Sequence, residues 1–173
     1  QIVIAEKPLP INVDAYIPGT VTNTYNKEGV SINSEGTFIQ GIIGIGGEKK
    51  GIIKFLVKNC YEKVNLSMIN GDLKDKIIVC GSFIDFDIYQ KIKGVGAKAI
   101  VCGGVDYNTI SKILGYSLGV AITGTEETTT LILTEGFGEI NMAEKTFILL
   151  KENENKIASV NGATQIRAGA VSY

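Results

Sequence analysis

Small and polar residues follow four apolar runs of the sequence, at the points where the predicted strands end. The runs are 76–80, 98–102, 118–123 and 130–134, and the candidate residues that follow them are Gly81, Ser82, Gly103, Gly104, Glu135, Gly136 and Gly138. If the first three strands are parallel, their carboxyl ends meet at one edge of a sheet, where open α/β sheets bind ligands. The link between the third and fourth strands is too short for a helical crossover, so the pairing of the fourth strand is left open. This glycine-rich edge is therefore a candidate site for a small anionic ligand. The alternative is structural, because turns after strands use glycine for a positive φ or for close packing.

Arg167 is a further candidate for anion binding, since every other basic residue of the chain is a lysine. A lysine cannot reproduce the planar, five-donor fork of arginine. One interpretation is that Arg167 clamps a carboxylate or main-chain carbonyls where the C-terminal strand meets the N-terminal sheet. The other is that it binds an anionic ligand or a charged group of a partner.

Cys80 and Cys102 end two of the apolar runs, which suggests two hypotheses. They form a redox pair if their strands are neighbours, or they are small buried hydrophobic residues. Nothing basic adjoins either cysteine to favour a thiolate, which favours the second hypothesis. Together with Cys60 they lack the spacing of a metal site, so we predict no metal.

Three glycine motifs resemble nucleotide-binding loops by letters alone. Residues 94–99 match a relaxed GxGxxA pattern, but they follow a helix and precede a strand, the reverse of a dinucleotide site. Residues 136–141 differ at the third position, and residues 44–50 lack the spacing of a Walker loop. We therefore predict no nucleotide site and no cofactor.

The composition excludes several classes of function. The chain has no histidine, which removes Ser-His-Asp and Cys-His catalysis and the ordinary zinc enzymes. A net charge of -1 over 173 residues gives no field for phosphates, so we predict no nucleic-acid binding. The apolar runs are far shorter than the ~20 residues of a membrane helix, so we predict no membrane insertion. Three cysteines without a visible secretion signal predict reduced thiols and a cytoplasmic location.

The N-terminal third of the chain is predicted to be rich in strands. Alternating polarity at 11–17 and β-branched residues at 20–25 each predict a strand. Further short strands are predicted at 30–32, 37–40 and 52–57. Short strands at such regular spacing are typical of a small barrel or a sandwich.

From about Gly71 the pattern changes to alternating strands and helices. The predicted strands are 76–80, 98–102, 118–123, 130–134 and 156–160. Two helices lie between them, the first from Asp85 to Gly94 and the second from a cap at Asp106 or Asn108 to Gly115.

A third helix is predicted to open at Asn141. Glu144 stands three residues further on, as in a capping box. Its apolar face is predicted to contain Ala143, Phe147 and Leu150.

These patterns predict a mixed fold of the α+β and α/β kinds. A barrel-like, β-rich part is expected at 1–70, and a small, mostly parallel α/β part at 71–161. A β tail at 162–173 is expected to return to the N-terminal sheet.

Several segments carry a resemblance to a known family. The strings 14–20, 36–48, 134–138 and 161–169 resemble an uncharacterised bacterial family in which a biotinyl/lipoyl-like barrel module precedes this segment. Residues 76–101 also look like the swivelling β/β/α and protease-associated modules, which are generally non-catalytic.

The expected function is a non-enzymatic binding or scaffolding module of a larger cytosolic bacterial protein. Its expected partners are other domains of that protein, or a separate protein. The alternative is an enzyme, or a subunit of one, that binds a small anion at the glycine-rich edge. A deep pocket with converging polar groups would favour the alternative, and a shallow surface would favour the module.

Overall fold

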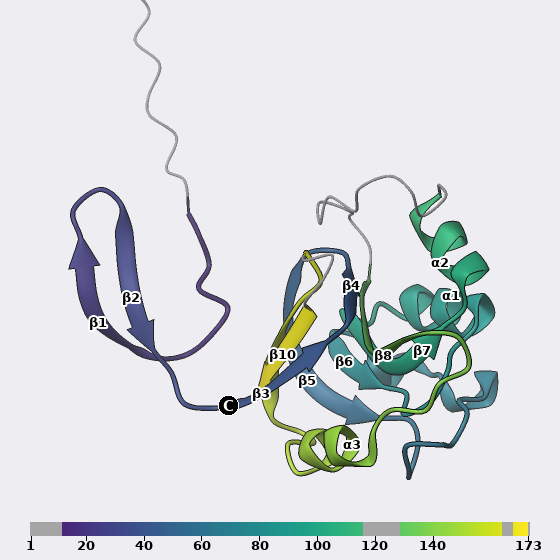
Figure 1. The fold of residues 1–173 in the computed structure, drawn as a ribbon. Helices are drawn as coiled ribbons and strands as arrows, with labels where there is room; N and C mark the ends of the chain where they lie inside the picture. Colours follow the sequence, from purple (N-terminus) through teal and green to yellow (C-terminus); the bar gives the residue numbers. More distant parts are fainter. Residues whose placement is uncertain (1–11, 116–128, 164–167, 173) are drawn as a thin grey trace, which may run out of the picture.

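A computed structural model describes residues 12–115, 129–163 and 168–172. They form a mixed α/β fold with a curled, half-barrel sheet and three α-helices (Figure 1). The strands are β1 (Thr20–Tyr25), β2 (Gly29–Asn33), β3 (Thr37–Gly41), β4 (Ile43–Ile45), β5 (Glu48–Phe55), β6 (Lys76–Val79), β7 (Ala99–Val105), β8 (Thr130–Phe137), β9 (Ile157–Asn161) and β10 (Ala168–Ser172). The helices are α1 (Phe86–Gly94), α2 (Tyr107–Leu114) and α3 (Glu144–Lys151), and two short 3-10 turns are η1 (Leu66–Met68) and η2 (Gly71–Leu73).

The curl of the sheet follows from the order of its strands, β3-β10-β9-β5-β6-β7-β8-β4. The two edge strands, β3 and β4, are consecutive in the chain and separated only by Ile42. The main-chain N–H of Ile42 donates to Leu133 O of β8 at 2.8 Å. One short stretch of chain therefore pairs with β10 at one side of the sheet and with β8 at the other, which brings the two sides together.

The strands from β5 to β8 run parallel to one another. Every residue of β7 is buried, and β6 and β8 are buried along most of their length. Such continuous burial explains why these segments are unbroken apolar runs instead of alternating patterns. The predicted strand at 118–123 lies outside the described residues.

Strands from both sides of residue 70 belong to this one sheet, because β3, β4 and β5 pair with β10, β8 and β6. β10 also pairs with β9. The division of the chain at residues 70 and 161 stays a prediction.

The hairpin of β1 and β2 forms a separate, two-stranded sheet. It projects away from the half-barrel in Figure 1, and all residues of β1 are exposed. The strand predicted at 11–17 is wrong for residues 12–17, which form no strand. Tyr16 there has a positive φ of 58°, and its N–H donates to the Asp14 side chain at 2.8 Å. This local hydrogen bond competes with an extended backbone.

The first two helices begin and end where the sequence predicts. Asp85 accepts from the N–H of Ile88 at 2.8 Å, and Asp106, not Asn108, caps α2 by accepting from Thr109. α2 stops at Gly115, which has a left-handed φ of 76°.

The predicted start of the third helix is wrong. α3 begins at Glu144, with Ala143 as its cap residue. The Asn141 side chain instead accepts a hydrogen bond from Ser82 Oγ at 2.7 Å, and this tertiary contact outweighs the capping box. Ala143 is exposed, whereas Phe147 and Leu150 are buried as predicted.

We expect Asp106→Ala to cost about 1 kcal/mol at neutral pH, the usual value of a lost helix cap. The side-chain hydrogen bond from Thr109 is the main cause that lowers the pKa of Asp106 below its ordinary value. A carboxyl group with a depressed folded-state pKa stabilises the fold above its unfolded pKa, and the effect is lost as the pH falls. Urea melts of the wild type and of Asp106→Ala, at neutral pH and near pH 3, measure the free energy of unfolding that the cap contributes. The difference between the two proteins should shrink at the lower pH, and a difference that persists would contradict this assignment.

Candidate functional site

The glycine-rich edge exists as a structural unit, since β6, β7 and β8 are parallel and end on the same side. Two of the strands are longer than their apolar runs indicate. β7 continues through Gly103 and Gly104, and β8 continues through Gly136 to Phe137. The candidate glycines therefore lie partly inside strands.

The chain itself fills this edge. Residues 138–143, called here the crossing segment, run over the ends of the strands and bind them through main-chain hydrogen bonds. Met142 N donates to Gly81 O at 2.8 Å, and Gly138 N donates to Val105 O at 3.0 Å. The crossing segment approaches Gly103 closely, since a Cβ atom there would lie 2.5 Å from Met142 N and 2.7 Å from Asn141 C. Gly103 is thus required for packing.

Gly81 is constrained in two ways. Its φ of +61° is in the left-handed region, and a Cβ atom there would lie 2.8 Å from Asn59 O. The segment after β5 therefore packs directly on this turn. Both structural reasons for glycine, a positive φ and a close approach, operate at the edge.

The polar candidates hold the crossing segment in place. Ser82 is buried, and its hydroxyl donates to Asn141 Oδ1. A carboxylate oxygen of Glu135 accepts from the N–H of Ala143 at 2.9 Å, at the start of α3. A carboxylate at that position is favourable for the helix dipole. Binding of a small anion at the edge stays a prediction. Arg167, the further candidate for anion binding, lies outside the described residues.

The cysteines Cys80 and Cys102 are fully buried and free. Burial raises the pKa of both thiols well above the ordinary value, and Cys80 adds to the effect at Cys102. Both therefore stay protonated at neutral pH, which removes the nucleophile that redox exchange needs. Cys60 differs, because it is partly exposed and lines a cavity.

We expect one of the three thiols to react with a disulfide reagent such as DTNB in the native protein. That thiol is Cys60, because the other two are inaccessible and protonated. Absorbance of the released thiolate gives the count, and denaturant should expose the remaining two. Cys60→Ser should abolish the native reaction. A second thiol that reacts rapidly in the folded state would contradict the burial described here.

An exposed aromatic surface that no sequence motif indicates lies at the same edge. Tyr107 and Phe137 are 48% and 42% exposed, and their ring centroids are 6.2 Å apart. Ile140 of the crossing segment is 38% exposed. The half-buried Phe83 lies nearby, since Lys63 is 5.9 Å from the centre of its ring and forms an ion pair with Glu139, the chain neighbour of Ile140. We call Phe83, Tyr107, Phe137 and Ile140 the aromatic patch.

The only signal for this patch in the sequence was the position of its members. Tyr107, Phe137 and Phe83 each come shortly after a predicted strand end. Their convergence depends on the parallel order of the strands and on the path of the crossing segment.

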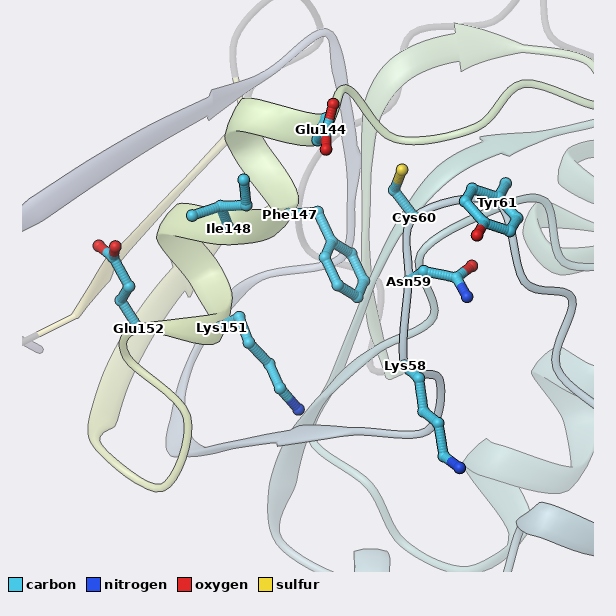
Figure 2. Close-up of a pocket in the computed structure, with 9 residues that line it drawn as sticks. All are labelled: Lys58, Asn59, Cys60, Tyr61, Glu144, Phe147, Ile148, Lys151 and Glu152. Carbon is cyan, nitrogen blue, oxygen red and sulfur yellow. The ribbon is translucent and has the colours of Figure 1, made fainter.

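A cavity of about 390 Å³ lies between α3 and residues 58–61, the segment that follows β5 (Figure 2). One side of it is lined by four residues of α3 and by the cap residue that follows the helix: Glu144, Phe147, Ile148, Lys151 and Glu152. Figure 2 shows Lys58 and Lys151 toward one end of the view, with Cys60 and Glu144 toward the other. The sequence carries no local signal for this cavity, because its two walls are more than 80 residues apart in the chain.

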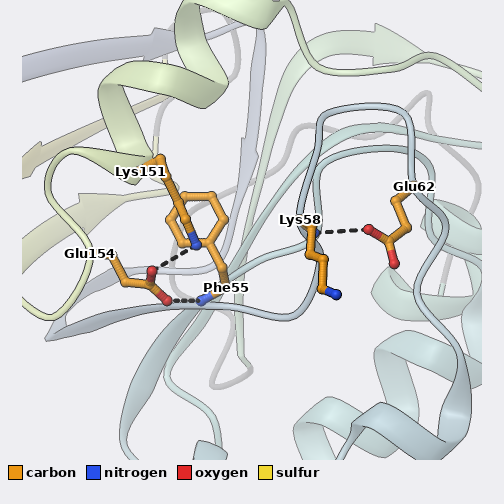
Figure 3. A network of polar contacts seen from close by, with 5 residues as sticks. All are labelled: Phe55, Lys58, Glu62, Lys151 and Glu154. Atoms are coloured by element: carbon orange, nitrogen blue, oxygen red, sulfur yellow. Dashed lines mark hydrogen bonds and ion pairs between the residues drawn. The ribbon is translucent and has the colours of Figure 1, made fainter.

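The two lysines of the cavity differ in their partners (Figure 3). Lys151 Nζ lies 2.7 Å from Glu154 Oε2 and 4.5 Å from the centre of the Phe55 ring. Burial opposes ionisation of Glu154, but the hydrogen bonds from Lys151 and from the Phe55 N–H outweigh it and lower its pKa. Lys58 uses its main-chain N–H to bind Glu62 at 2.8 Å, while its ammonium points elsewhere.

Comparison of the chain with protein-family models gives no match, and comparison with curated proteins gives none. The described residues contain no group of three or more acidic or cysteine side chains placed to hold a metal ion. Within the same part of the chain, no helix has the length and apolar character needed to cross a membrane.

Proposed function

We propose that this chain is a non-enzymatic binding or scaffolding module of a larger protein, and that it docks through the aromatic patch. The observation that carries the proposal is at the glycine-rich edge. The edge where α/β sheets hold ligands is filled by the crossing segment, and beside it the aromatic side chains of Tyr107 and Phe137 are exposed to solvent.

The chemistry of the patch fits a protein partner. Aromatic side chains are enriched at the centres of protein interfaces, where they bury large areas at little cost in side-chain entropy. A cation and an anion border the patch, since Lys63 lies over the ring of Phe83 and forms an ion pair with Glu139, the chain neighbour of Ile140. An apolar centre with a charged rim is the usual anatomy of an interface.

The partner that we propose is another domain of the same longer protein. The resemblance of residues 36–48 and 161–169 to a bacterial family with a preceding biotinyl/lipoyl-like barrel supports this proposal. The absence of histidine and the protonated state of the buried cysteines also favour binding over catalysis. A cytosolic bacterial setting is part of the same proposal.

A photocrosslinking residue placed at position 137 tests the docking surface. In the protein produced from its complete gene, we expect crosslinks from this position to residues outside the present chain. Leu66, on η1 and 46% exposed, is the matched control position. Crosslinks to a separate protein would show a different partner at the same surface. Crosslinks confined to this chain would overturn the proposal.

The variant Phe137→Ser measures how much Phe137 contributes to the affinity for the partner. Because Phe137 is partly exposed, the change should alter the stability of the chain by less than about 1 kcal/mol. It should weaken the association with the crosslinked partner at least tenfold, as for a central aromatic residue of an interface, roughly 2 kcal/mol. An unchanged dissociation constant would show that the patch is not the docking surface.

A further inference from the structure

The cavity beside α3 has the size and lining of a binding site for a small molecule. Its volume of about 390 Å³ is within the range of ligand pockets, roughly 300–1,000 Å³. Phe147 and Ile148 give it an apolar wall, and charged side chains stand at its margins (Figure 2). This combination of an apolar surface with a few polar groups fixes both the affinity and the orientation of a ligand.

Lys58 is the cation that remains available to a ligand. Lys151 already pairs with Glu154 and lies over the Phe55 ring. Glu62, the acid nearest to Lys58 in Figure 3, is bound by the main-chain N–H of Lys58 and not by its ammonium. Across the described ranges, no carboxylate lies within ion-pair distance of the Lys58 ammonium.

The charges of the lining restrict the class of ligand. Lys58 and Lys151 contribute two positive charges, and Glu144 and Glu152 contribute two negative ones. Because Lys151 is already paired with Glu154, Lys58 can neutralise one negative charge of a ligand, and the second charge of a dianion would stay unneutralised beside the two glutamates. A carboxylate is therefore favoured over a phosphate monoester.

The wall of the cavity also contains an unsatisfied polar group. The side-chain oxygen of Asn59 is buried and accepts no hydrogen bond from the residues that the structure describes. Buried polar groups without a partner are uncommon in folded proteins.

We propose that the cavity between α3 and residues 58–61 binds a small apolar monocarboxylate. The carboxylate lies against Lys58, and the hydrocarbon part covers Phe147 and Ile148. Because Cys60 lines the same cavity, a bound ligand shields its sulfur. This site is distinct from the aromatic patch, so neither proposal depends on the other.

The test uses 3-phenylpropionate as the probe and the alkylation of Cys60 by iodoacetamide as the readout. For a ligand of this size we expect a dissociation constant of roughly 1 mM. At about ten times that concentration, alkylation should slow about tenfold, in proportion to the unoccupied fraction. Mass spectrometry locates the modification, and calorimetry gives a second readout that does not depend on Cys60.

Two comparisons identify which chemical group of the ligand the cavity recognises. The neutral amide of the probe and the dianion phenyl phosphate should each bind about tenfold more weakly, because the first lacks the charge-assisted bond and the second is repelled. Lys58→Gln should weaken binding of the carboxylate by a similar factor. Lys145→Gln, an exposed lysine of α3 outside the cavity lining, is the matched control. Protection is compared within each variant, since a nearby charge also alters the intrinsic reactivity of the thiol.

The outcomes separate clearly. Selective protection by the carboxylate, lost in Lys58→Gln and kept in Lys145→Gln, supports the proposal. Equal protection by the amide, or protection that survives Lys58→Gln, overturns the role of Lys58 and the class of ligand. Neither protection nor heat of binding at concentrations of roughly 10 mM would overturn the site itself.

Discussion

Gly103→Ala is expected to destabilise the protein by about 3 kcal/mol or more, an unusually large effect for one added methyl group. The methyl carbon would lie 2.5 Å from Met142 N and 2.7 Å from Asn141 C, and both atoms belong to the main chain of the crossing segment. A main chain cannot move aside as the end of a flexible side chain can. The segment is also fixed at both ends, by the hydrogen bonds of Gly138 and Met142. The added carbon must therefore displace the segment or spread the sheet.

Gly94→Ala is the matched control for this change. Gly94 ends α1, and a Cβ atom there would meet nothing within 4 Å. Alanine is a better helix former, so this variant should be neutral or more stable by up to about 1 kcal/mol. Urea melts of the two variants measure the difference. If Gly103→Ala unfolds at the same urea concentration as the wild type, the crossing segment does not pack on β7 as described.

Where local signals decide the structure, the sequence was sufficient to predict it. The parallel strands β6 and β7 were visible as unbroken apolar runs, because burial on both faces leaves no polar alternation. Asp85 was recognisable as a cap, and Asp106 as one of two candidates beside Asn108, because a cap depends on a hydrogen bond between residues only three apart in the chain.

Tertiary contacts decided the features that could not be predicted. Asn141 and Glu144 have the letters of a capping box, but Asn141 is engaged by Ser82, which is 59 residues away in the chain. The sequence around the glycines of the edge does not indicate which segment packs against them. Gly103 packs against the crossing segment, which begins only after β8, the next strand of the sheet. The cavity and the aromatic patch depend on the same long-range packing. Their residues became candidates only when the fold brought them together.

Phe147→Ala is expected to cost about 3–5 kcal/mol, the usual range for truncation of a buried phenylalanine. Phe147 is 6% exposed and meets Phe55 of β5 edge to face, with the ring centroids 5.1 Å apart. This pair joins α3 to the sheet, and the ammonium of Lys151 lies over the same Phe55 ring. The truncation therefore removes buried area, an aromatic pair and part of the support for Lys151. Since a domain of this size has a typical stability of 5–15 kcal/mol, the loss should be visible as a large shift of the urea midpoint.

Ile148→Ala on the same helix is the control, because Ile148 is 48% exposed and its truncation should cost less than about 1 kcal/mol. If the two variants lose equal stability, Phe147 does not anchor α3 to β5.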